Sequence, residues 1–270
     1  MISKVPVLLA QITDTHLFAD PTQGKMYGVL TESSFIKVLE KLAQLQPPPD
    51  VLLLTGDISQ DETPESYQRL ASLLSPLNIP TYWIAGNHDC LPIMEQELNY
   101  APISSKKYFE MGGWHFLLLN TNVPGCVHGQ IYPESLEWLE SQLKMIGKKP
   151  VLIALHHPPV KINSEWMDRI ILHDPEPLLN IINRYPQVKV VLSGHVHQEF
   201  DTEINGVRYL TTPSTCIQFE PKNPKFVLDK KPPGLRLMNL YPDGNYTTKI
   251  ERSDYIYEFD ITASGYSKNG

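Results

Sequence analysis

Six short segments rich in valine, isoleucine and leucine are the feature that most constrains the fold of this chain. They cover residues 5–14, 50–57, 81–89, 114–120, 150–157 and 188–195. Each segment is apolar at consecutive positions rather than at alternate ones, which is typical of strands buried on both faces of a sheet. Other elements must therefore cover the sheet on both sides.

Amphipathic segments with helical periodicity lie between several of these strands and supply that cover. They span residues 31–45, 63–77, 132–146 and 175–185. Thr31 and Thr63 are candidate N-caps, and Pro64 and Glu65 suit the first turn of the second helix. Strands that alternate with helices in this way predict a layered α/β fold.

The pattern changes after residue 197. Antiparallel strands are predicted over residues 205–219, 234–251 and 255–261, with Asn-Gly and Asp-Gly turns. The intervening segment 221–234 is rich in proline and lysine and is predicted to be a loop. The chain thus ends in a β extension of a different character from the α/β part.

Composition narrows the classes of function. The formal net charge of −7 over 270 residues, without a run of Lys or Arg, disfavours binding to polymeric nucleic acid or to an acidic membrane surface. The three cysteines are widely spaced, which argues against a disulfide framework and against a thiolate metal site. Since no long apolar run is present either, we expect a cytoplasmic protein without a membrane segment.

Polar residues cluster where the apolar strands end. The first strand is followed by Asp14 and His16, and the clusters after the other strands contain Asp57, Asn87, His88, His156, His195 and His197. In an open α/β sheet, ligands bind outside the carboxyl ends of the strands, so these side chains should converge. Each motif alone has an ordinary interpretation as a turn, a cap or a strand end. All of them together in one chain favour a metal site.

The donor types indicate which metals would suit this site. Carboxylate, amide and imidazole ligands without thiolate are typical of a pair of first-row ions such as Mn, Fe or Zn. Asp57 is the carboxylate best placed to bridge two such ions. His195 and His197 are two residues apart, so an extended chain would present both imidazoles on one side, and Gly194 would let the backbone approach closely.

The ordered set D-x-H, G-D, G-N-H-D, H-H-P and G-H-x-H resembles the calcineurin-like metallophosphoesterase superfamily over residues 5–216. The stretches NVPGCVHGQI, LEWLESQL and TTPSTCIQF resemble its class III cyclic-nucleotide phosphodiesterase branch, and they are also similar to the related glycerophosphodiesterases. Segment 221–234 lies outside the resemblance, so its contribution to substrate choice is open.

The resemblance implies a four-layer αββα sandwich. Residues 1–216 would form the metallophosphoesterase catalytic domain, and the C-terminal antiparallel β extension, residues 217–270, would pack on that domain. One metal is assigned to Asp14, His16, Asp57 and His197, and the other to Asp57, Asn87, His156 and His195. His88 would stand beside the bound phosphate.

This resemblance predicts an enzyme that hydrolyses small phosphodiesters by attack of a metal-bridging hydroxide. The leading substrates are 3′,5′-cyclic nucleotides, above all cAMP, which would be opened to 5′-nucleotides. Catalytic roles are expected for Asp57, Asn87 and His88. A glycerophosphodiesterase or a phosphomonoesterase is the alternative, and His88 argues against a non-catalytic metal-binding scaffold. A homodimer is expected because related enzymes are often dimers.

The remaining polar residues near the motifs have weaker interpretations. We expect Asp89 to have a structural role, orienting a histidine. His157 should support the site from behind or pack under Pro158, and a contact with substrate is open. His115 is expected to pack within a sheet, and His128 lies in a loop that could line the pocket.

Overall fold

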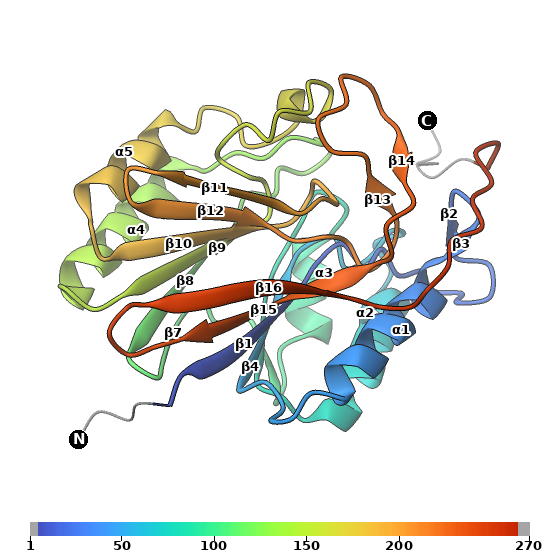
Figure 1. The fold of residues 1–270 in the computed structure, drawn as a ribbon, viewed down its shortest axis with the longest axis horizontal. Helices are drawn as coiled ribbons and strands as arrows, with labels where there is room; N and C mark the ends of the chain where they lie inside the picture. The colour runs from blue at the N-terminus through green and yellow to red at the C-terminus, as the bar shows by residue number, and fades with distance from the viewer. Residues whose placement is uncertain (1–4, 264–270) are drawn as a thin grey trace.

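The computed structural model describes residues 5–263, and within this range two six-stranded sheets pack face to face (Figure 1). None of the helices in the described range is long and apolar enough to cross a membrane. Helices cover both outer faces, so the layers follow the order helix, sheet, sheet, helix. The predicted four-layer αββα sandwich is confirmed.

The first sheet has the strand order β16-β15-β1-β4-β5-β6. Its strands are β1 (Val7–Ile12), β4 (Val51–Thr55), β5 (Thr81–Ile84), β6 (Ile103–Ser104), β15 (Gly234–Leu240) and β16 (Tyr246–Arg252). The four strands from β1 to β6 are parallel, whereas β15 pairs antiparallel with β1. Strands β15 and β16 of the C-terminal extension therefore continue the first sheet beyond β1.

The second sheet has the strand order β11-β12-β10-β9-β8-β7. Its strands are β7 (Tyr108–Met111), β8 (Trp114–Leu119), β9 (Val151–Leu155), β10 (Val188–Ser193), β11 (Phe200–Ile204) and β12 (Val207–Thr211). The central strands are parallel, and β7 and β11 are antiparallel edges. Two small ribbons, β2 (Lys25–Met26) with β3 (Val29–Leu30) and β13 (Gln218–Phe219) with β14 (Leu228–Asp229), lie outside these sheets.

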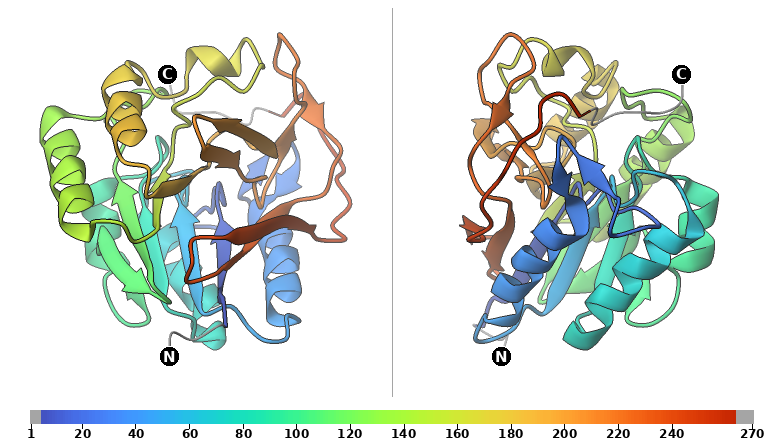
Figure 2. Two further views of the ribbon diagram at one scale, coloured as in Figure 1. Left: turned by 60° about the vertical axis from the view of Figure 1, so that its left-hand side comes forward. Right: turned by 90° about the vertical axis from the view of Figure 1, so that its right-hand side faces the viewer.

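Helices α1 (Thr31–Ala43), α2 (Pro64–Leu74) and α3 (Leu91–Glu97) pack on the first sheet, and α4 (Pro133–Ile146) and α5 (Glu176–Arg184) pack on the second. Figure 2 shows α4 and α5 on one side of the strands and α1 on the other. A third apolar core fills the space between the sheets, with Leu9, Leu53, Phe116, Leu152 and Val190 fully buried. Strands buried on both faces explain the uninterrupted apolar segments of the sequence.

Three local predictions were wrong or incomplete. Residues 255–261 form no strand, although Tyr255, Tyr257 and Phe259 pack against the cluster formed around Phe219. Thr31 is the first residue of α1 rather than its cap, whereas the Thr63 hydroxyl does accept the Ser66 N–H at 3.3 Å. Helix α3 and strands β2, β3, β6, β7 and β11 were not foreseen, and segment 221–234, predicted as a loop, contains the two-residue strand β14.

Candidate metal centre

The predicted ligands converge at the carboxyl ends of the parallel strands of both sheets. Asp14 and His16 follow β1, Asp57 follows β4, Asn87 follows β5, His156 follows β9, and His195 and His197 follow β10. All of them are at most 8% exposed. Several groups of these side chains bring their ligand atoms within 4.8 Å of one another, the distance expected around a metal ion.

Asp14, His16 and His197 form the first group. His197 Nε2 lies 3.5 Å from Asp14 Oδ1 and 3.1 Å from His16 Nε2. The other ring nitrogens are occupied: His197 Nδ1 lies 2.9 Å from the Ile217 carbonyl, and His16 Nδ1 lies 2.7 Å from Gln60 Oε1. Both acceptors are oxygens, so both Nδ1 atoms carry protons and both Nε2 atoms carry lone pairs.

Two imidazole lone pairs that face each other at this distance repel unless a cation lies at the site. Burial is the main influence that lowers the pKa of His16, to about 3, so the His16 ring is neutral at neutral pH. A transition-metal ion coordinated by both nitrogens and by the Asp14 carboxylate fits the donor set. The first group therefore has the chemistry of a metal site.

Asp57 connects this group to a second one. Its Oδ2 atom lies 3.8 Å from His16 Nε2 and 3.4 Å from His156 Nε2, so it stands between the two groups. His156 Nε2 also lies 3.3 Å from Asn87 Oδ1, while its Nδ1 donates to the Thr55 carbonyl at 2.7 Å. Burial alone would raise the pKa of Asp57, but His156 and His88 outweigh it and hold that pKa well below its usual range. Asp57 is therefore an ionised carboxylate that lies between the two groups.

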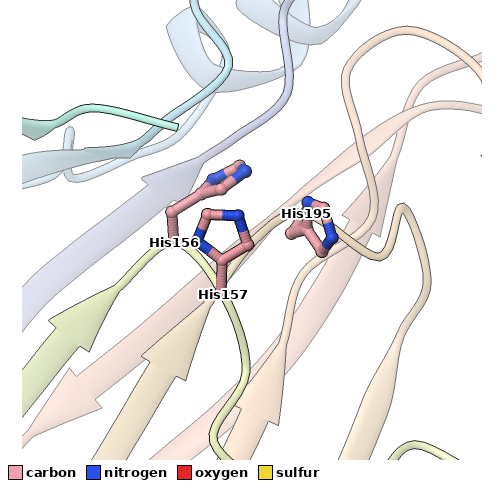
Figure 3. A group of neighbouring side chains, drawn as sticks. All are labelled: His156, His157 and His195. Atoms are coloured by element: carbon pink, nitrogen blue, oxygen red, sulfur yellow. The ribbon is translucent and has the colours of Figure 1, made fainter. Parts of the chain in front are cut away.

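His195, which follows β10, lies beside His156 of the second group, with ring centroids 5.2 Å apart (Figure 3). Its Nε2 atom lies 3.0 Å from the Ile170 carbonyl and therefore donates, which leaves Nδ1 as the lone-pair atom. Burial, the main cause, lowers the pKa of His195 to about 3, so the ring is neutral. Its backbone N–H donates to both Asp14 carboxylate oxygens at 3.1 Å, which ties the two groups together.

The backbone around the site is left-handed. Asp14, His16, Asp57, His195 and His197 have φ between +46° and +67°. Non-glycine residues avoid this region at a cost of roughly 1–2 kcal/mol each, and such outliers concentrate at functional sites. His195 and His197 are thus not part of an extended chain. The premise that alternation brings them together was wrong, and turns formed by left-handed residues aim both rings.

Close backbone approach explains two glycines of the motifs. A Cβ on Gly86 would lie 2.2 Å from Asp57 Oδ1, and a Cβ on Gly194 would lie 2.1 Å from Thr13 Oγ1. Both contacts are shorter than atoms tolerate. The predicted role of Gly194, to bring the backbone close to the site, is confirmed.

Asp89 has a structural role, but its partners are backbone amides rather than a histidine. Its carboxylate accepts the N–H groups of Ile58 and Ser59 at 3.0 Å and of Gly86 at 2.9 Å. It therefore fixes the turns that carry Asp57 and Asn87. The pKa of Asp89 is raised to about 7, mainly by burial, and the three amide donors act in the opposite direction.

The other histidines lie around the centre in different ways. His115 is buried in β8 and bonds to the Tyr108 hydroxyl at 2.9 Å, which confirms sheet packing. His128 stacks on His173 at a ring distance of 3.8 Å, outside the groups of possible metal ligands. His157 contacts both His156 and His195 but has both ring nitrogens bonded elsewhere. The Ile170 carbonyl and Gln60 were missed, because neither carries a motif.

Comparison with known proteins places this centre in a family. Residues 7–199 match the family described as calcineurin-like phosphoesterase. The chain belongs to that family. It is 47% identical over 264 residues to a 3′,5′-cyclic-nucleotide phosphodiesterase of Nostoc sp., covering 98% of this chain and 99% of that one. It is 39% identical to the 3′,5′-cyclic adenosine monophosphate phosphodiesterase CpdA of Escherichia coli, with 98% and 97% covered.

Solved structures support the fold of this family member. A dimetal phosphatase from Danio rerio superposes with a TM-score of 0.66 at 13% identity, covering 92% of this chain and 96% of that one. A purple acid phosphatase from yellow lupin superposes with a TM-score of 0.70 at 13% identity, covering 95% and 53%. At this identity the likeness concerns the arrangement of the sheets and helices.

Proposed function

We propose that this protein is a metal-dependent phosphodiesterase that hydrolyses 3′,5′-cyclic nucleotides, above all cAMP, to 5′-nucleotides. The observation that carries the proposal is the pair of buried ligand groups joined by Asp57 Oδ2. The substrate class is supported by the relatives of nearly equal length that are named for this activity.

Two metal ions would be held by the residues described above. Asp14, His16, Asp57 and His197 suit one ion, and Asp57, Asn87, His156 and His195 suit the other. Imidazole nitrogens favour Mn, Fe or Zn over Mg, which prefers oxygen ligands. When bound, such a pair lowers the pKa of water toward about 7 and neutralises charge on phosphoryl oxygens.

Side chains of the protein would orient the metal ions and the substrate and would protonate the leaving group. The backbone N–H of His88 donates to Asp57 Oδ1 at 2.8 Å, and its ring lies 5.1 Å from that of His16. A ring nitrogen of His88 also lies within 4.8 Å of ligand atoms of His16 and Asp57, so its imidazole would be placed to supply a proton to the leaving ribose 3′-oxygen or to stabilise charge on the phosphoryl group. The Asn87 amide oxygen, beside His156, would bind the second ion.

A kinetic panel tests the proposal. Metal-free protein reconstituted with Mn²⁺ should cleave cAMP and cGMP faster than 2′,3′-cyclic AMP or glycerophosphodiesters, and Mg²⁺ should restore little activity. Bis(p-nitrophenyl) phosphate should be cleaved with a higher kcat/KM than p-nitrophenyl phosphate. Preference for the monoester would point to a phosphatase, and preference for glycerophosphodiesters to that branch of the family.

Two finer assignments stay predictions. A homodimer is tested by analytical ultracentrifugation of the metal-loaded protein. A location in the cytoplasm is tested by fractionation of the producing cells.

A further inference from the structure

His157 is a buried imidazole at the centre that the proposed chemistry does not use. Its ring lies edge-on to His156, with centroids 4.7 Å apart and planes at 89°, and tilted against His195 at 4.5 Å (Figure 3). It is 0% exposed. A ring in direct contact with two predicted metal ligands either binds a metal or controls how those ligands are held.

A ring nitrogen of His157 lies within 4.8 Å of ligand atoms of His156 and His195, but hydrogen bonds occupy both of its ring nitrogens. His157 Nε2 lies 3.1 Å from the Val127 carbonyl, which only accepts, so this nitrogen carries the proton. His157 Nδ1 lies 2.8 Å from Thr121 Oγ1, whose hydroxyl therefore donates to it. No lone pair is left for an ion.

These bonds close loop 121–129 around the ring. The loop enters at Thr121 and leaves at Gly129, where a Cβ would lie 2.3 Å from His157 Nδ1. With the Val127 carbonyl held as well, the imidazole fills the inside of the loop. The conformation of the loop therefore depends on this ring and on its tautomer.

Loop 121–129 in turn holds segment 158–173. The Gly129 N–H donates to the Ile171 carbonyl at 3.3 Å, and the His173 N–H donates to the Gly129 carbonyl at 2.8 Å. The neighbouring Ile170 carbonyl accepts from His195 Nε2 at 3.0 Å. The group that fixes the tautomer of His195 thus lies on a segment held by the loop around His157.

We propose that His157 is a positioning residue for the second metal site. Through loop 121–129 and segment 158–173 it places the Ile170 carbonyl, which keeps the proton of His195 on Nε2 and presents Nδ1 to the metal. The same ring sets the spacing of His156 and His195 by direct packing. This inference rests on the proposed function only in taking His156 and His195 as metal ligands.

The chain offers a matched set of variants. His157→Phe keeps the ring and removes both hydrogen bonds. Thr121→Val removes only the hydroxyl that sets the tautomer of His157, and Thr121→Ser keeps that hydroxyl. His115→Phe is the control, because His115 is also a buried imidazole bonded to a hydroxyl, that of Tyr108, but it lies in β8 away from the centre.

The first measurement is a calorimetric titration of the metal-free variants with Zn²⁺. Loss of a group that orients a metal ligand typically weakens metal binding about 10–100-fold. His157→Phe should weaken Zn²⁺ binding at the site of His156 and His195 by that factor, and Thr121→Val should weaken binding at the same site by about 10-fold. Thr121→Ser and His115→Phe should bind within about twofold of the parent. Unchanged affinity in both Thr121→Val and His157→Phe overturns the proposal.

The second measurement identifies the tautomer of His195 in the metal-free protein by long-range ¹H–¹⁵N correlation of the histidine rings. The parent, Thr121→Ser and His115→Phe should show the proton on Nε2, whereas Thr121→Val should show a mixture of tautomers. A pure Nε2–H form in Thr121→Val contradicts the coupling. Loss of one complete ion in His157→Phe, with Thr121→Val unaffected, would instead make His157 a ligand. Neither readout involves a substrate, so an error in the proposed activity leaves both intact.

Discussion

The two sheets of the sandwich contribute different chemistry to the centre. The first sheet supplies both carboxylates, Asp14 and Asp57, the Asn87 amide oxygen and one imidazole, that of His16, whereas the second sheet supplies imidazoles alone: His156, His195 and His197. Every predicted oxygen ligand therefore comes from one side of the interface between the sheets. Neither sheet by itself could hold a pair of first-row ions, because four of the seven predicted ligands follow strands of the first sheet and three follow strands of the second.

The difference means that the centre depends on how the two sheets are held against each other. The apolar core between them sets the separation, and polar side chains cross it near the site. Gln11 in β1 donates to the Ser193 carbonyl of β10 at 3.1 Å, and Arg236 in β15 donates to the Thr211 carbonyl of β12 at 2.7 Å. A metal site that spans the interface is sensitive to the ligands of each sheet and to these cross-links.

The largest expected effect comes from removing the carboxylate shared by both groups. Asp57→Ala should lose most of both ions and at least about 10³-fold in activity, because metal-ion stabilisation of phosphoryl transfer is worth several kcal/mol. His197→Ala should weaken mainly one ion. Plasma spectrometry of the purified variants measures metal per chain, with Asp243→Ala in the distant β15–β16 turn as a control. Two ions retained in Asp57→Ala would refute the bridging role.

His88 follows β5 of the first sheet, and the loss of rate when it is removed should depend on the leaving group of the substrate. General acid catalysis is typically worth about 10²–10⁴-fold, and ribose 3′-oxygen needs a proton more than p-nitrophenolate does. His88→Ala should therefore slow cAMP hydrolysis by a factor in that range and bis(p-nitrophenyl) phosphate hydrolysis much less, with metal content unchanged. Equal losses on both substrates would show that His88 stabilises charge instead, and loss of metal would make it a ligand.

The sequence revealed the parts of this arrangement that have local signatures. Apolar segments buried on both faces can only be central strands, and Asp57 or His156 at the end of such a strand lies at the sheet edge where ligands bind. Residues 255–261 alternate like a strand, yet Ile256 is 85% exposed while the aromatic residues pack inward. The alternation correctly indicated which side chains face inward, but residues 255–261 do not pair with the edge of any sheet.

What orients the ligands could not be predicted from the sequence. The Thr55, Ile170 and Ile217 carbonyls fix the tautomers of three histidines, and a backbone carbonyl has no sequence signature. The left-handed turns at His195 and His197 are occupied by residues that usually avoid them, so propensity pointed to an extended chain. Arg236 is 24 and 25 residues from Thr212 and Thr211 in the sequence, and these residues become its partners only when the two sheets close.

The cross-link made by Arg236 gives a prediction of intermediate size. The side chain is 2% exposed, and its Nε and Nη atoms donate to Thr212 Oγ1, Thr211 O and Thr248 Oγ1 at 3.1, 2.7 and 2.8 Å. Burial lowers its pKa to about 10. Arg236→Met should reduce the free energy of unfolding by about 1–3 kcal/mol, because it leaves buried oxygens without donors. Urea unfolding measures this, and a variant as stable as the parent would show that the cross-link is dispensable.

Lys107 joins the sheets at the opposite edge and gives the smallest effect, one that depends on pH. It lies between β6 of the first sheet and β7 of the second, and its Nζ donates to the Trp83 carbonyl at 3.0 Å and lies 4.0 Å from the centroid of the Trp83 ring. Burial lowers the pKa of Lys107 to about 8 from an ordinary value of 10.5. Below pH 8 both folded and unfolded chains hold the proton, so the cost of the buried charge is constant there.

Between about pH 8 and 10.5 the unfolded chain keeps a proton that the folded chain has released. The contribution of Lys107 to the free energy of unfolding therefore rises with pH across this window, by at most about 1.4 kcal/mol per pH unit. Lys107→Met removes this contribution, so the stability of the variant relative to the parent should fall between pH 7.5 and pH 10. Lys106→Met, at an exposed neighbour, should follow the parent across the same range. Urea unfolding at several pH values measures the difference, and parallel curves for the parent and Lys107→Met would show that this contact is hydrated and does not constrain the two sheets.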